Sequence, residues 1–133
     1  MAPRILYVDN ITPLNWLVNQ FLSGASFAVT SVDDPEGALD RARREVPDAI
    51  VLDPSFADHE GWEVLASLQS DAELSQVPTV IYTALPETTI ADHAARCLYD
   101  DLRYVSKDED LDSLLDRLAE ATGAPSLAEY WSA

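Results

Sequence analysis

The stretch at residues 47–65, PDAIVLDPSFADHEGWEVL, contains the feature that decides the fold. Four consecutive apolar residues, 49–52, are followed at once by Asp53 and a proline, and a helical pattern resumes near Trp62. A short apolar run without alternation is typical of a central strand in a parallel sheet, because such a strand is buried on both faces. A polar residue directly after this strand lies at the carboxyl edge of the sheet, where open α/β sheets bind their ligands.

Similar apolar runs lie on both sides of this stretch, at residues 5–8, 27–32, 79–82 and 103–106. Helical patterns fill the intervals, and the first is the clearest, with Thr12 as N-cap, Pro13 at the first helical position and Gly24 after the end. Its apolar residues form one predicted stripe, namely Leu14, Leu17, Val18, Phe21 and Leu22. Five strands that alternate with five helices predict an α/β domain with a doubly wound parallel sheet.

Composition limits the possible functions. The 133 residues have a formal net charge of -16, which disfavours binding to nucleic acid or to an anionic membrane surface, since both are polyanions. A single cysteine, Cys97, excludes an internal disulfide framework and fits a reducing compartment. No apolar run approaches the ~20 residues of a membrane span, and the N-terminus does not resemble a signal peptide. We therefore expect one acidic, cytoplasmic domain.

Polar residues follow four of the five predicted strands. Asp9 and Asn10 follow the first strand, Asp53 the third, Thr83 the fourth, and Lys107, the only lysine of the chain, the fifth. The carboxyl ends of parallel strands meet at one edge of a sheet. We therefore expect two carboxylates, an amide, a hydroxyl and an ammonium group to converge in one shallow pocket.

The four blocks that surround these residues resemble one known family, the receiver domains of two-component response regulators. The blocks are ILYVDN at 5–10, PDAIVLDPSFADHEGWEVL at 47–65, VPTVIYTA at 77–84 and RYVSK at 103–107, in the order and spacing of the family. The resemblance extends from residue 4 to about 122 and is to the single-domain type. It implies a flavodoxin-like receiver fold of strand order 2-1-3-4-5 flanked by five helices, with a receiver domain at 1–122 and a tail at 123–133.

The resemblance also implies a role for each strand-end residue. Asp53 corresponds to the phosphoacceptor, Thr83 to the hydroxyl that binds the phosphoryl group, and Lys107 to its cationic partner. Thr83 and Tyr104 correspond to the pair of residues whose movement after phosphorylation changes the surface of the domain. Tyr104 lies on the last predicted strand. Such a domain is not an enzyme beyond its own phosphorylation and dephosphorylation. Positioning and charge stabilisation account for most of phosphoryl-transfer catalysis, so these residue types suit it.

A magnesium site is implied as well, held by Asp9, Asn10, the carboxylate of Asp53 and the backbone carbonyl of Ser55. Asn10 departs from the family, which usually has a second acid there. With Mg²⁺ and the lysine present, this loss leaves the site with one positive charge in place of none. We therefore predict weak Mg²⁺ binding before phosphorylation.

Two further departures concern the loops of the site. Asp108 stands where the family has a proline after Lys107, so we expect a trans peptide bond there and a carboxylate that competes for the lysine. Ala57 stands where the family often has a loop proline, which predicts a looser loop at 54–60.

The leading functional hypothesis is a phosphorylated receiver whose partners are a sensor histidine kinase or a histidine phosphotransfer protein, followed by a downstream protein target or a second copy of itself. The alternative is a pseudo-receiver, used as a phosphorylation-independent interaction or dimerisation module. A third hypothesis is a magnesium-dependent phosphohydrolase with Asp53 as nucleophile. It is weakened because such enzymes have a second aspartate two residues later, and this chain has Ser55 there.

Trp16 lies opposite the apolar stripe of the first helix, and we predict either a partner contact there or a cover formed by the tail at 123–133.

Overall fold

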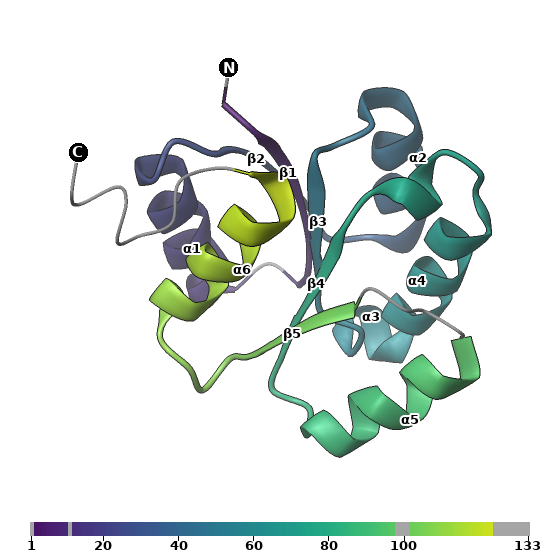
Figure 1. Ribbon diagram of the computed structural model, residues 1–133. Coiled ribbons are helices and arrows are strands. Elements are labelled where there is room, and N and C mark those ends of the chain that lie inside the picture. The colour runs from purple at the N-terminus through teal and green to yellow at the C-terminus, as the bar shows by residue number, and fades with distance from the viewer. Residues whose placement is uncertain (1, 11, 98–101, 124–133) are drawn as a thin grey trace.

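The computed structural model describes residues 2–10, 12–97 and 102–123, in which strands and helices alternate (Figure 1). The strands are β1 (Arg4–Val8), β2 (Ala28–Val32), β3 (Ala49–Leu52), β4 (Thr79–Thr83) and β5 (Leu102–Ser106). The helices are α1 (Pro13–Gly24), α2 (Pro35–Glu45), α3 (Phe56–His59), α4 (Gly61–Ser70), α5 (Glu87–Cys97) and α6 (Leu111–Thr122), with the 3₁₀ turn η1 (Leu74–Gln76). Within these ranges, no helix is both long and apolar enough to cross a membrane.

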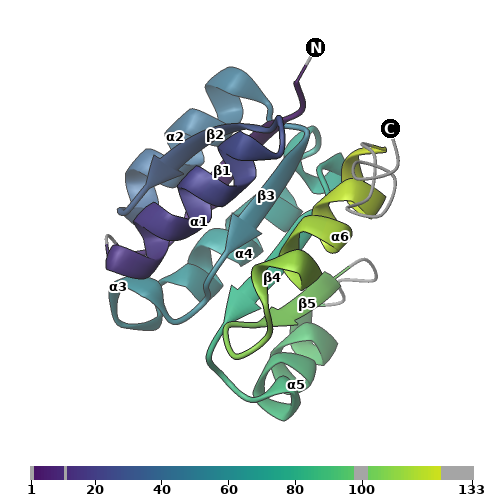
Figure 2. The same ribbon diagram turned by 90° about the vertical axis from the view of Figure 1, so that its left-hand side faces the viewer.

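The sheet is parallel throughout and has the strand order β2-β1-β3-β4-β5. Helices α1 and α6 cover one face, and α2, α4 and α5 cover the other (Figures 1 and 2). Alternate residues of β1 face the two layers: Leu6 and Val8 pack towards α2 and α4, and Ile5 and Tyr7 pack towards α1 and α6. The predicted doubly wound fold and its strand order are confirmed.

The number of helices differs from the five that we predicted, because α3 is an additional short element between β3 and α4. Ala57 and Asp58 within it have left-handed backbone conformations, with φ values of 51° and 54°. Phe56 is fully buried in the core at the start of this turn. Gly61, the first residue of α4, lies in close contact with the loop before α3: a Cβ there would lie 2.7 Å from Pro54 Cα. Phe56 and Gly61 therefore anchor the two ends of this loop, and the looser loop that we expected at 54–60 stays a prediction.

Helix α1 begins as predicted, because Oγ1 of Thr12 accepts a hydrogen bond from the N–H of Asn15 at 3.1 Å. Its buried face is centred on Asn15, Val18 and Leu22, so the predicted apolar stripe is wrong at Leu17, which is 52% exposed. At about 100° per residue, a helix that turns Val18 and Leu22 inward turns Leu17 towards solvent. Packing against β2 and α6 determines the rotation of α1 about its axis. The apolar residues of this helix are spread too widely around it for the sequence alone to fix that rotation.

The register of the strands brings their carboxyl ends to one edge of the sheet. Val8 pairs with Leu52, Leu52 with Ile81, and Thr83 with Ser106. The residues that follow β1, β3 and β5 therefore start from adjacent positions, together with the last residue of β4.

Candidate functional site

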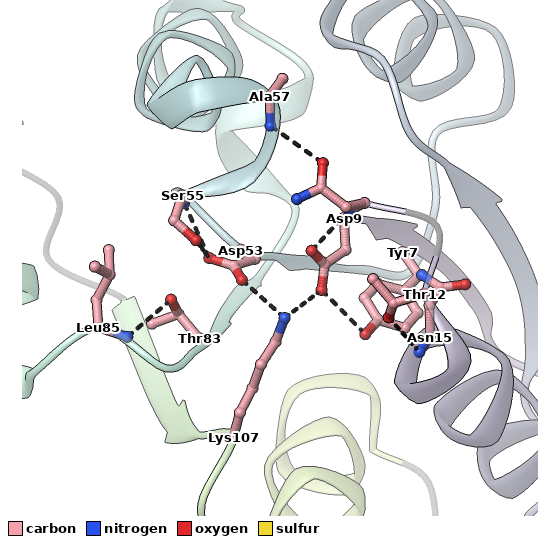
Figure 3. A network of polar contacts seen from close by, with 11 residues as sticks. Tyr7, Asp9, Thr12, Asn15, Asp53, Ser55, Ala57, Thr83, Leu85 and Lys107 are labelled. Carbon is pink, nitrogen blue, oxygen red and sulfur yellow. Dashed lines mark hydrogen bonds and ion pairs between the residues drawn. The ribbon is translucent and has the colours of Figure 1, made fainter.

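Lys107 joins the two strand-end aspartates at this edge. Its Nζ lies 2.6 Å from Oδ2 of Asp9 and 2.8 Å from Oδ2 of Asp53 (Figure 3). Both carboxylates are buried, each with 4% of its residue surface exposed, and hydrogen bonds from the ammonium compensate part of the cost of burial. The predicted convergence of these three side chains is present in the structure.

The second oxygen of Asp53 is held by the loop that follows it. Oδ1 accepts hydrogen bonds from the backbone N–H of Ser55 at 2.9 Å and from its hydroxyl at 2.7 Å. Burial raises the pKa of Asp53, but hydrogen bonds from Lys107 and Ser55 outweigh it and hold the pKa below its ordinary value. Asp53 is therefore a carboxylate at neutral pH, as a nucleophile must be.

Asp9 and Lys107 are affected differently by the same contacts. Burial raises the pKa of Asp9, and the neighbouring charge of Asp53 acts in the same direction. Burial lowers the pKa of Lys107, but the two carboxylates outweigh it and hold the pKa above its ordinary value. With both carboxylates ionised, the cluster has one net negative charge, which attracts a cation.

Thr83 and Tyr104 are connected through the backbone of Leu85. The hydroxyl of Thr83, a fully buried residue, accepts a hydrogen bond from the N–H of Leu85 at 3.2 Å (Figure 3). The hydroxyl of Tyr104 donates to the carbonyl of Leu85 at 3.0 Å, and its ring packs against the core on the α2 and α4 side. A hydrogen bond from Thr83 also lowers the pKa of Asp53. The predicted switch pair is therefore connected through Leu85, and its member Thr83 influences the pKa of Asp53.

Asn10 faces the loop of α3. Its Oδ1 accepts a hydrogen bond from the backbone N–H of Ala57 at 3.3 Å. The two departures from the family pattern, Asn10 and Ala57, are therefore in contact with each other. A proline at position 57 could not make this contact, because it has no N–H to donate.

Asp108 does not compete for Lys107, contrary to our expectation. Its side chain is exposed, and its N–H donates to Oγ of Ser106 at 3.1 Å. Oε2 of Glu109 accepts from the N–H of Ser106 at 2.7 Å and further fixes this loop. The peptide bond after Lys107 is trans, as predicted.

The donors at this edge fit a magnesium ion. Among the described residues there is no group of three acids, histidines or cysteines that could hold a metal. Mg²⁺ does not need one, because it keeps several water molecules and binds through one or two carboxylates. Asp9 and Asp53 provide two carboxylates, and their excess negative charge over Lys107 favours a cation. The carbonyl of Ser55 stays a predicted ligand.

Tyr7 contacts this cluster from the core of the domain. Tyr7 was missed by the sequence analysis, although its hydroxyl donates to Oδ2 of Asp9 at 3.3 Å. Its position two residues before Asp9, on the same side of the strand, is the signal that could have identified it.

Trp16 is 62% exposed beside Leu17, on a helix that has no charged residue. The tail that we considered as a cover lies outside the described residues except for Gly123.

Comparison with known proteins identifies the family. The sequence model of the response regulator receiver domain matches residues 5–119. The protein-glutamate methylesterase/protein-glutamine glutaminase 1 of Anaeromyxobacter dehalogenans (strain 2CP-C) is 36% identical over 96 residues, which cover 71% of this chain and 27% of that protein. The response regulator PleD of Caulobacter vibrioides (strain NA1000 / CB15N) is 34% identical over 85 residues, which cover 64% of this chain and 19% of that protein. The chain thus spans less than a third of the length of either relative.

Solved structures agree in fold. The receiver domain of a sensor histidine kinase from Pseudomonas aeruginosa PAO1, whose crystal structure has a magnesium ion coordinated in the active site cleft, superposes with a TM-score of 0.79. It is 22% identical, and the match covers 92% of this chain and 99% of that one. The strand order, the matched residues and these relatives lead to one conclusion: the chain belongs to the response regulator receiver domain family of two-component signalling.

Proposed function

We propose that the chain accepts a phosphoryl group on Asp53 from a histidine kinase or a histidine phosphotransfer protein, and passes the signal on through protein contacts. The observation that carries this proposal is the position of Lys107, whose ammonium lies 2.8 Å from Oδ2 of Asp53 and 2.6 Å from Oδ2 of Asp9. A cation at this position stabilises the negative charge that an incoming phosphoryl group brings.

The transfer step is a displacement at phosphorus. An oxygen of the Asp53 carboxylate forms a P–O bond while the P–N bond of the donor's phosphohistidine breaks. The electron pair of the broken bond stays on the imidazole nitrogen, which takes up a proton from solvent. The lowered pKa of Asp53 supports this role, because the attacking carboxylate is already deprotonated.

We propose Mg²⁺ as the cofactor, held by Asp9, Asp53 and the carbonyl of Ser55. When bound, the ion neutralises phosphoryl oxygens during transfer. Its affinity is weak in this proposal, because Asn10 contributes no charge and its amide oxygen accepts a hydrogen bond from Ala57.

The output is a change of surface that starts at Thr83. A phosphoryl oxygen on Asp53 accepts a hydrogen bond from the Thr83 hydroxyl and draws it inward, and the N–H of Leu85, which donates to the oxygen of that hydroxyl, is drawn with it. Movement of this backbone segment alters the acceptor of the Tyr104 hydroxyl, the carbonyl of the same residue. The surface around β5 and α5 is therefore the one that we assign to the downstream partner.

The docking surface for the phosphodonor is assigned to α1. Trp16 and Leu17 are the large apolar side chains most exposed among the described residues, with 62% and 52% of their surface accessible. They lie on an uncharged helix in a chain with 24 acidic residues, so the helix itself adds no like charge against an acidic partner. A kinase or phosphotransfer protein with an apolar helical face fits this patch.

The alternative of a phosphorylation-independent interaction module is not favoured. Two buried carboxylates held around one ammonium are costly to maintain, and a surface used only for binding does not require them.

The test is incubation with Mg²⁺ and acetyl phosphate, followed by intact mass, with Asp53→Asn as the control. One phosphoryl group per chain in the wild type and none in the variant support phosphoacceptor function. A folded wild type without an adduct supports the interaction module, and sustained consumption of acetyl phosphate over many turnovers supports a phosphohydrolase.

A further inference from the structure

Tyr7 brings a polar group into the core directly below the site. The residue is fully buried, with 0% of its surface exposed, and it packs among the apolar residues between the sheet and helices α1 and α6. Its hydroxyl donates to Oδ2 of Asp9 at 3.3 Å (Figure 3). A buried hydroxyl without an acceptor is costly, so this contact resists any rotation that would turn Oδ2 of Asp9 away from it.

The contact also determines how the two oxygens of Asp9 are used. Oδ2 accepts from Tyr7 and from Lys107, and these two donors occupy both of its lone pairs. Oδ1 accepts from the backbone N–H of Asn10 at 2.7 Å and keeps a second lone pair. In Asp9, Oδ2 therefore binds only protein donors, and Oδ1 can bind a further ligand.

We propose that Tyr7 is a positioning residue for the cation site, because its buried hydroxyl holds Oδ2 of Asp9 towards Lys107 and leaves Oδ1 with a lone pair that a cation could use. This inference rests on the proposed function only for the identity of the cation. Groups that orient a ligating carboxylate in this way affect metal affinity although they do not touch the metal.

The experiment uses the full chain with Tyr7→Phe, which keeps the aromatic ring and removes the hydroxyl. Tyr82→Phe is the matched control, since Tyr82 is also buried in this core and its ring centre lies 5.7 Å from Nζ of Lys107. Each protein is titrated with magnesium chloride while the side-chain NMR signal of ¹³C-labelled lysine is recorded. Lys107 is the only lysine, so the signal reports this site and not the many acidic residues of the surface.

We expect the Kd for Mg²⁺ to rise about tenfold in Tyr7→Phe and to change less than about twofold in Tyr82→Phe. Circular dichroism of both variants establishes that they are folded. Equal Kd values for Tyr7→Phe and wild type overturn the inference, and so does a wild type whose lysine signal does not respond to Mg²⁺. Acetyl phosphate labelling of the wild type is a separate readout: an adduct with unchanged Kd in Tyr7→Phe refutes only the positioning role, whereas a tenfold loss without any adduct refutes only the phosphoacceptor role.

Discussion

Nζ of Lys107 and Oδ2 of Asp53 lie 2.8 Å apart, although 54 positions separate the two residues in the chain. The contact forms because β5 and β3 end at the same edge of the sheet, on either side of β4. It pairs the only lysine of the chain with the carboxylate to which we assign the phosphoryl group.

The pKa of Lys107 is predicted to lie above its ordinary value of 10.5, because the contacts with Asp53 and Asp9 outweigh burial. A raised pKa stabilises the folded state fully below the ordinary value, and this stabilisation is lost as the pH rises through the folded-state pKa. We therefore expect the free energy of unfolding to decrease above about pH 10.5. NMR titration of the labelled lysine measures the pKa, and a midpoint at or below 10.5 contradicts the arrangement of charges described above.

Asn10→Asp is predicted to strengthen Mg²⁺ binding. The substitution adds a negative charge at the site and keeps an oxygen that can accept from the N–H of Ala57. A Kd lower by about tenfold or more is expected, since charges at contact distance near a protein surface interact by more than about 1.4 kcal/mol. Gln20→Glu, which adds the same charge at an exposed position of α1, is the control. Equal gains in both variants would show that the effect is one of overall charge.

Ala57→Gly is predicted to stabilise the protein. Ala57 has a φ of 51°, which an L-residue adopts at a cost and glycine adopts freely, and the N–H to Asn10 is retained. We expect the free energy of unfolding in urea to rise by about 0.5–1 kcal/mol. Ala66→Gly, at an exposed position inside α4, is expected to lower it by about 1 kcal/mol. A similar loss in both variants would mean that position 57 is not left-handed in solution.

Trp16→Ala is predicted to separate docking from chemistry. Trp16 is 62% exposed, so its truncation changes stability by less than about 0.5 kcal/mol. Phosphotransfer from a histidine kinase that labels the wild type is expected to slow by about tenfold or more, as for an aromatic anchor of an interface. The reaction with acetyl phosphate needs no docking surface and is expected to proceed at the wild-type rate. If both reactions slow equally, α1 is not the donor surface.

Much of this site could be predicted because the strands that carry it have apolar runs, with polar residues at or directly after their ends. The sheet topology then determines which of these residues meet. Parallel strands bring Asp9, Asp53, Thr83 and Lys107 to one edge wherever the intervening helices lie. The trans peptide after Lys107 was predicted on the same local grounds, from the absence of a proline.

The features that could not be predicted depend on packing. No glycine marks the left-handed turn at Ala57 and Asp58, so α3 was missed. The rotation of α1 that exposes Leu17 depends on its contacts with β2 and α6. The hydrogen bond between Tyr7 and Asp9 depends on side-chain orientation within a strand whose residues 5–8 are apolar except for one hydroxyl.

The central claim, that Asp53 is the phosphoacceptor, is tested most directly by locating the modified residue. The chain is incubated with acetyl phosphate and Mg²⁺ and then reduced with borohydride, which converts an aspartyl phosphate to homoserine. Peptide sequencing by mass spectrometry then identifies the converted position. We predict homoserine at position 53 alone. Homoserine at Asp9 or at another acidic residue, with Asp53 unchanged, would contradict the account.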